Sequence, residues 1–389
     1  MIKKALPFLR ARLCVDIETT QITKEVLEEK PFSVKEIFED NWSSYLLVNK
    51  VREVELKEVE KMLSCKGIER GCFIYSCPNC KKELIVPFGC NSRICSCCGK
   101  RHTDKWADKL TKKIIKNLTY RHLTFSMPEI LWNYIKEKRE LQKVLMDVAA
   151  ATIKEMFSCA LKQEVVPGII IVIHPFGRDI VFKPHVHALV TEGGYSSQNK
   201  FVKLGNYIDY NTFHKKWQYN FLTALRNFIP QSIIDLCFRR YTNGFVAYIK
   251  PEKLHYGKGL IKYIGRYIRH PAIANSRIID YNGKGVTFYY EDNKGNKNFK
   301  TMGVFDFISA IIQHIPERNF RLVRYYGVYS RNNIKRFTKI EHQSVIEDKI
   351  LNKTKEKRVV YCPCCSERME LIAYVKKPPS KNTNLITNW

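Results

Sequence analysis

The sequence predicts an α+β protein with a largely antiparallel sheet, preceded by a zinc-binding module. Strand-like and helix-like segments alternate through the middle and later parts of the chain, which favours this fold class. An apolar hairpin with histidines lies at the centre of the chain, over residues 169–192. Two C-x₂-C pairs lie upstream of it. With 389 residues, 45% of them hydrophobic, the chain can bury a sizeable core in two or three domains.

The order of these patterns divides the chain into four parts. The first part is a helical lead-in, because Val51, Val54, Val59 and Met62 recur at helical spacing between charges. Its function cannot be derived from this pattern. The predicted parts are a lead-in over 1–63, a zinc-binding domain over 64–112, a sheet-bearing domain over 113–345 and a C-terminal segment over 346–389.

The charge balance points to a polyanionic partner. Lys and Arg number 66 against 38 Asp and Glu, a net charge of +28, for which nucleic acid is the usual explanation. No apolar run is long enough to span a membrane, and Arg10 and Arg12 interrupt any signal-peptide core. We therefore expect a cytoplasmic protein with a nucleic-acid partner.

The 14 cysteines indicate zinc rather than disulfides, because many are paired at knuckle spacing. Cys77 and Cys80, with Cys95 and Cys98, are expected to form one tetrahedral Cys₄ site. Left over are Cys65, Cys72, Cys90, Cys97 and His102, which could complete a second site. Near the end of the chain, Cys362 and Cys365 form half a knuckle whose partners must come from elsewhere, and the spare N-terminal cysteines are candidates.

Basic residues surround the N-terminal knuckles, among them Arg93 and Arg101. They are expected to meet DNA phosphates, although a purely structural zinc module would also carry surface charge. The stretch 320–333 combines bases and aromatics, and Arg324 within it is a second DNA-binding candidate. The alternative for this stretch is an ordinary strand edge.

The central hairpin predicts a divalent-metal site. His185 and His187 alternate along one strand and so share a face. A turn at Gly177–Asp179 would set His174, on the preceding strand, opposite His185, at a Cβ separation of about 4.5–5.5 Å. Three imidazoles converging there would leave coordination positions open, typical of a catalytic metal. The alternative is packed or exposed histidines without a ligand.

A helix over residues 259–269 carries the second chemical pattern. Tyr263 and Tyr267 stand at i, i+4, between an apolar stripe and a basic stripe. The basic stripe consists of Lys262, Arg266 and Arg269, which are further DNA-binding candidates. Two amphipathic tyrosines at a core edge would show the same spacing, so the pattern gains meaning only beside the histidine site.

Taken together, these segments resemble the two-tyrosine HUH transposases of rolling-circle insertion sequences, the IS91 type. The resemblance covers nearly the whole chain. The sequence segments on which the resemblance depends are CPNC…CNSRICSCCGK, HLTFSMPEIL, HPFGRDIVFKPHVHALVTEGG, YIGRYI followed by SRI, and HIPERNFRLVRYYGVYS. The extra Cys97 inside the second knuckle departs from the family pattern.

The resemblance implies an HUH nuclease domain in which His185 and His187 bind Mg²⁺ or Mn²⁺ and Tyr263 and Tyr267 are the nucleophiles. His174 as the third ligand rests on the hairpin geometry, and it is similar to the third histidine of relaxases. The implied activity is nicking and rejoining of single-stranded DNA at the element's ends and at target DNA, through a 5′-phosphotyrosine. A homo-oligomer is compatible with this activity, and no nucleotide cofactor is expected.

Two other functions remain open at this point. A rolling-circle replication initiator or relaxase would use the same chemistry, although the zinc module and the RYYG segment favour a transposase. The chain has no P-loop, which argues against helicase-fused relatives. A non-catalytic zinc-ribbon DNA-binding protein is the alternative from another class.

Overall fold

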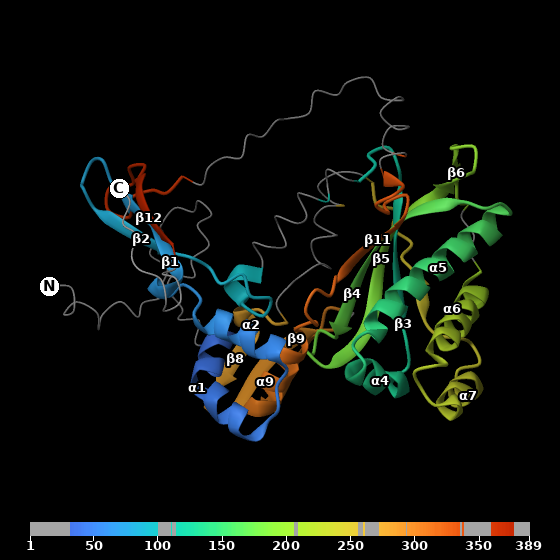
Figure 1. Ribbon diagram of the computed structural model, residues 1–389, viewed down its shortest axis with the longest axis horizontal. Helices are drawn as coiled ribbons and strands as arrows, with labels where there is room; N and C mark the ends of the chain where they lie inside the picture. Colours follow the sequence, from blue (N-terminus) through green and yellow to red (C-terminus); the bar gives the residue numbers. More distant parts are fainter. Residues whose placement is uncertain are drawn as a thin grey trace.

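The computed structural model describes residues 32–99, 110, 114–205, 209–255, 260, 272–292, 294–334, 337 and 359–376. These residues have the predicted α+β architecture, and their strands pair antiparallel in three sheets (Figure 1). No helix within these ranges combines the length and the apolar character needed to cross a membrane.

The largest sheet has the strand order β11-β4-β5-β3-β7, with β6 paired to β5. Its strands are β3 (Tyr120–Ser126), β4 (Val166–Phe176), β5 (Phe182–Tyr195), β6 (Phe201–Lys203), β7 (Ala247–Ile249) and β11 (Val323–Gly327). The β4–β5 hairpin lies at its centre because β4 is an almost continuous run of buried β-branched residues. Such a run is stable only where both faces of a strand are covered.

Helices cover one face of this sheet. They are α4 (Trp132–Glu137), α5 (Leu141–Leu161), α6 (Tyr210–Leu225) and α7 (Gln231–Arg240). Figure 1 shows α5 and α6 lying alongside the strands. Trp217 of α6 is fully buried, and its ring meets that of Phe125 on β3 edge-on at 5.0 Å. Ile169, Ile171 and Ile173 belong to the same core, so this face is the apolar foundation of the domain.

On the opposite face of the sheet, the apolar residues that the structure describes form only a partial cover. Ile170 and Val172 of β4 and Leu189 of β5 join a smaller cluster there with Tyr120 of β3. Leu260 also belongs to this cluster and is 2% exposed. The histidines lie on this same face, next to the cluster, because they keep its alternation along β4 and β5.

A second core lies beside the large sheet. It contains α1 (Val34–Val48), α2 (Glu53–Leu63), α9 (Val304–Gln313) and the small sheet β8 (Ile278–Tyr281), β9 (Gly285–Glu291) and β10 (Lys297–Gly303). Helix α1 begins with a capping box of Ser33 and Glu36, in which each side chain accepts from the other's backbone N–H. Phe38 of α1 and Phe307 of α9 are fully buried in this core.

The N-terminal helices α1 and α2 are part of the second core and not a separate unit. The sequence suggested a separate lead-in, but α1 and α2 pack against α9 and residues 278–312, more than 200 positions later. Residues 272–315 therefore share a core with the lead-in rather than with the helix-covered face of the large sheet. The apolar stripes of α1 and α2 indicated burial but could not identify this partner.

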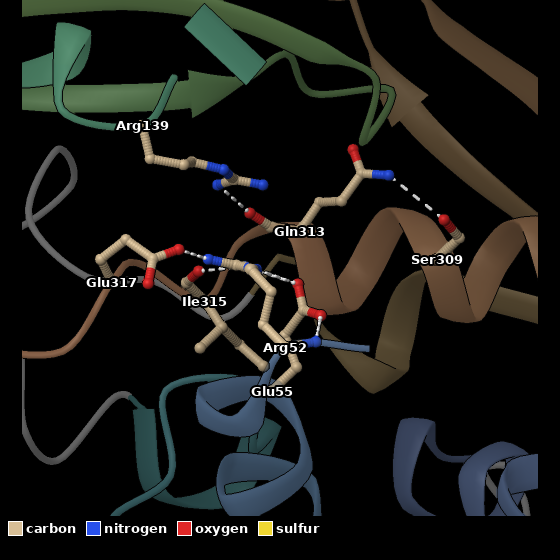
Figure 2. Close-up of polar contacts among 7 residues, drawn as sticks. All are labelled: Arg52, Glu55, Arg139, Ser309, Gln313, Ile315 and Glu317. Atoms are coloured by element: carbon tan, nitrogen blue, oxygen red, sulfur yellow. Dashed lines mark hydrogen bonds and ion pairs between the residues drawn. The ribbon is translucent and has the colours of Figure 1, made fainter. Parts of the chain in front are cut away.

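Two arginines donate hydrogen bonds to carbonyls at the end of α9, one from the start of α2 and one from between α4 and α5 (Figure 2). The Nη2 of Arg52, at the start of α2, donates to the carbonyl of Ile315 at 2.7 Å, and its guanidinium also pairs with Glu55 and Glu317. The Nη1 of Arg139, between α4 and α5, donates to the carbonyl of Gln313 at 2.9 Å. Cations suit the carbonyl end of a helix. This polar joint connects the second core to the helices of the large sheet.

The third sheet has the order β12-β1-β2 and contains part of the predicted zinc ribbon. Strands β1 (Gly71–Ser76) and β2 (Glu83–Pro87) form a hairpin, and β12 (Glu370–Lys376) pairs with β1 from the far end of the chain. In Figure 1 the red β12 lies beside the blue β1 and β2, away from the large sheet.

Candidate metal centre

The three predicted histidines converge on the central hairpin. His174 and His185 are directly opposite each other in the register of β4 and β5, and His187 lies opposite Val172. One nitrogen from each ring falls within 4.8 Å of the others. The expected cross-strand pair is therefore confirmed. The expected turn also forms, with the Gly177 N–H donating to the Val181 carbonyl at 2.9 Å.

The ring of His185 is oriented by its own strand. Its Nδ1 lies 2.6 Å from the carbonyl of Lys183. Because a carbonyl can only accept, Nδ1 carries the proton and the lone pair of Nε2 is left for a metal. A backbone carbonyl in this role is a common way to fix the tautomer of a metal-binding histidine.

The ring of His187 is oriented by β3. Its Nδ1 lies 2.9 Å from Nε2 of His122 and 3.2 Å from the hydroxyl of Thr124. The two imidazoles are nearly parallel, with an interplanar angle of 22°. An Nδ1–H of His187 that donates to His122 directs Nε2 of His187 away from β3, into the group of three.

Burial keeps these rings neutral. Desolvation is the main cause that lowers the pKa of His185, and it lowers the pKa of His187 well below its ordinary value. The pKa of His122 falls to about 3, again mainly by burial and then by the charge of Lys250. A neutral imidazole is the form that binds a metal, so the site does not have to lose protons first.

His122 is a site residue that the sequence reading missed. It lies on β3 within HLTFS, where alternation puts His122, Thr124 and Ser126 on one face. Thr124 pairs with His187 and Ser126 with His185, so this face is the histidine face. The alternating pattern could have identified His122, but its partner strand could not be known without the sheet order.

The predicted tyrosine helix lies mostly outside the described residues. Tyr263 and Tyr267, with Lys262, Arg266 and Arg269, are among those not described, and so is Arg101. Leu260 is described. It is buried in the cluster on the histidine face, three positions before Tyr263.

Two of the predicted DNA-binding arginines have partly buried side chains. Arg93 lies in the loop between Cys90 and Cys95, its backbone N–H donates to Glu58, and burial lowers the pKa of its guanidinium. Arg324 on β11 pairs with Ile171 of β4, so it lies on the helix-covered face, away from the histidines. Its guanidinium stacks over Phe320 at 6.0 Å. Arg324 is therefore not part of the metal centre.

The cysteines form two groups, and the predicted grouping of Cys77 and Cys80 with Cys95 and Cys98 is wrong. Cys95 and Cys98 join Cys65 and Cys90, while Cys77 and Cys80 join Cys362 and Cys365. In each group the sulfurs lie within 4.8 Å of one another. The two C-x₂-C pairs therefore belong to different groups. Cys77 and Cys80 lie between β1 and β2, whereas Cys95 and Cys98 lie in the segment after β2. The partners of Cys362 and Cys365 are not the spare cysteines.

Comparison with known proteins gives this geometry a context. A family model described as a putative transposase matches residues 168–336, which include the three histidines. Another, described as a transposase zinc-binding domain, matches residues 37–127. That match contains the first cysteine group completely but only Cys77 and Cys80 of the second.

Two curated relatives agree with the family models. The chain is 28% identical over 322 residues to the transposase for insertion sequence element IS801 of Pseudomonas savastanoi pv. phaseolicola, with 76% of each chain covered. It is 24% identical over 284 residues to the putative transposase y4qJ of Sinorhizobium fredii, covering 68% of this chain and 71% of the relative. No solved structure matches the chain. Together, the two family models and the curated relatives support an IS91-type transposase with a zinc-binding domain near its N-terminus.

Proposed function

We propose that this transposase nicks and rejoins single-stranded DNA at the ends of an insertion sequence, with Tyr263 and Tyr267 as nucleophiles. Mg²⁺ or Mn²⁺ would be held by His174, His185 and His187. The observation that supports this most strongly is the convergence of one nitrogen from each ring within 4.8 Å, on the sheet face opposite helices α5 and α6.

The donor set fits such an ion. Three neutral nitrogens leave coordination positions open, and the hydrogen bonds of His185 and His187 direct Nε2 of both rings into the group. A divalent ion bound there would polarise a non-bridging oxygen of the scissile phosphate and offset the charge that develops during attack.

The covalent step is carried out by residues of the chain. The phenolate oxygen of one tyrosine attacks phosphorus, the bond from phosphorus to the 3′ oxygen breaks, and that oxygen leaves and takes up a proton. The protein keeps the 5′-phosphate as an ester, so rejoining needs no nucleotide cofactor. A phenol has a pKa of about 10 and is mostly protonated at neutral pH, so we expect the positive charges of Lys262 and Arg266 to stabilise the phenolate. The second tyrosine would allow a second cleavage.

Leu260 supports the nearness of the tyrosine helix to the histidines. Its side chain is buried with Ile170, Val172 and Leu189 on the face that carries them. Tyr263 follows within one helical turn if the predicted helix forms. This gives the phenols a route to the same face.

The remaining assignments complete the proposal. Residues 64–112 would form the zinc domain and 113–345 the nuclease domain, with Arg93, Arg101 and Arg269 contacting DNA. Single-stranded DNA suits the site, because an unpaired strand leaves its phosphates accessible to the protein. We place the reaction in the bacterial cytoplasm, at the nucleoid, with a homo-oligomer as a further expectation.

A covalent-adduct assay tests the proposal. Single-stranded oligonucleotides tiled across the flanks of the coding gene are incubated with the full chain and Mn²⁺, then separated under denaturing conditions. A 5′-phosphotyrosine link predicts that label at the 3′ end of the oligonucleotide moves with the protein, while 5′ label stays on a free fragment. The adduct should disappear in the double variant Tyr263→Phe, Tyr267→Phe and in His187→Ala.

The matched control is Tyr219→Phe on α6, which removes a phenol that is 53% exposed and remote from the proposed helix in sequence. It should leave the adduct unchanged. An adduct that persists in the double variant would exclude these tyrosines, and transfer of 5′ label would exclude the proposed polarity.

A further inference from the structure

We propose that Cys77, Cys80, Cys362 and Cys365 bind a structural zinc ion of their own, and that this ion holds the C-terminal strand β12 on the ribbon. The zinc-domain match ends at residue 127 and so contains only half of these ligands. The inference does not depend on the nuclease chemistry, because it concerns a separate part of the chain.

The two halves of the site have the same backbone geometry. The carbonyl of Cys77 accepts from Lys81 N–H at 3.0 Å, and its N–H donates to the carbonyl of Lys82 at 2.9 Å. The carbonyl of Cys362 accepts from Ser366 N–H at 2.9 Å, and its N–H donates to the carbonyl of Glu367 at 2.7 Å.

The repeated geometry extends to the dihedral angles. Lys81 and Ser366, each four residues after the first cysteine of its half, have φ values of 55° and 57°. A positive φ at a residue other than glycine is uncommon, and here it occurs at the same position twice. Two distant segments therefore form the same type of knuckle.

The sulfur positions fit a tetrahedral ion. Cys77 and Cys365 are 3.4 Å apart at sulfur, Cys80 and Cys362 are 3.5 Å apart, and Cys80 and Cys365 are 3.7 Å apart. Zn–S bonds of about 2.3 Å in a tetrahedron place their sulfurs about 3.8 Å apart. These separations are far longer than a disulfide bond of about 2.05 Å.

Backbone N–H groups also point at the sulfurs. The Cys80 N–H donates to the sulfur of Cys77 at 3.5 Å, and the Cys364 N–H donates to the sulfur of Cys362 at 3.4 Å. Hydrogen bonds of this kind stabilise thiolate, the form that binds zinc. Cys364 itself is exposed and does not join the group.

Among the described residues, little else holds strand β12. All seven of its residues are exposed, and the small buried cluster beneath the knuckles consists of Cys77, Cys362 and Met369. Backbone pairing with β1 is its main attachment. A small sheet with so little apolar burial is marginal alone, and metal binding contributes its free energy directly to folding.

The first cysteine group has different support. Cys65, Cys90, Cys95 and Cys98 are all buried and belong to the second core, beside Val59 and Met62 of α2. Loss of an ion from the second group should therefore leave the first group intact. We expect two zinc ions per chain that can be removed separately.

Zinc stoichiometry of the full-length protein tests the site. We expect two zinc ions per chain by elemental analysis for the unmodified protein and for Cys364→Ser, and one for the double variant Cys362→Ser, Cys365→Ser. Cys80→Ser, on the other half of the site, should also retain one. Cys364 is the matched control, since it lies in the same knuckle outside the ligand group.

Hydrogen exchange tests the role of the ion. In the double variant, amides of residues 370–376 should lose protection while those of α1 and α2 keep theirs, whereas Cys364→Ser should retain protection throughout. The zinc site is overturned if the double variant keeps two ions, if the unmodified protein holds one, or if Cys364→Ser loses an ion. Loss of both ions in the double variant overturns the independence of the two groups, and unchanged protection of β12 overturns its attachment by zinc.

Discussion

Replacing His122 is the sharpest test of how the histidine group is held. Its Nε2 lies 2.9 Å from Nδ1 of His187, and the residue is 3% exposed, so water cannot easily take its place. Outer partners of metal-binding histidines typically contribute about 10–100-fold in metal affinity. At about 1.4 kcal/mol for each factor of ten, His122→Leu should cost about 1.4–2.8 kcal/mol of Mn²⁺ binding free energy.

The assay is calorimetric titration of the metal-free protein with Mn²⁺, supported by the electron paramagnetic resonance signal of free Mn²⁺. His122→Gln should recover part of the affinity, because its amide oxygen can accept from His187. His255→Ala is the control, since it removes an exposed histidine. If His122→Leu is folded, by its melting curve, and binds Mn²⁺ as tightly as the unmodified protein, the proposed orientation of His187 is refuted.

Three further predictions concern stability, each measured as the free energy of unfolding in urea. Trp217→Ala empties a fully buried site in the main core and should cost about 3–5 kcal/mol; a smaller loss than 1 kcal/mol would contradict the core assignment. Gly327→Ala should lower the free energy of unfolding far more than Gly283→Ala. Both glycines have positive φ, but a Cβ at Gly327 would meet the Pro167 carbonyl, whereas a Cβ at Gly283 would have no atom within 4 Å among the described residues. Equal losses in the two variants would contradict this reasoning. Arg139→Met should cost about 1–3 kcal/mol, because it leaves the Gln313 carbonyl of the polar joint without its donor, and no loss would mean that the joint contributes nothing.

The local parts of the structure were predictable from the sequence. The strand that carries His185 and His187 follows from alternation, and its pairing with His174 follows from a short turn. Phe213 and Trp217 of α6 recur at helical spacing, which indicates one apolar face, and both are fully buried. In each case the informative residues are neighbours in sequence.

The cysteine grouping was not predictable, because it depends on contacts between distant segments. Spacing identified Cys77–Cys80 and Cys95–Cys98 as two knuckles but could not decide which knuckle faces which. The segments that complete the groups lie 30 residues away for Cys65 and 282 residues away for Cys362. The partner of α1 and α2 escaped prediction for the same reason, since an apolar stripe indicates burial without a partner.

The ribbon cannot be completed early during protein synthesis. Half of its second thiol group is translated only when residues 362–365 leave the ribosome, long after β1 and β2 have emerged. A copy of the gene interrupted between the codons for residues 336 and 362 would yield a chain with both family-matched regions but without Cys362, Cys365 and β12. Such a chain would show whether the C-terminal segment that carries β12 is needed for transposition.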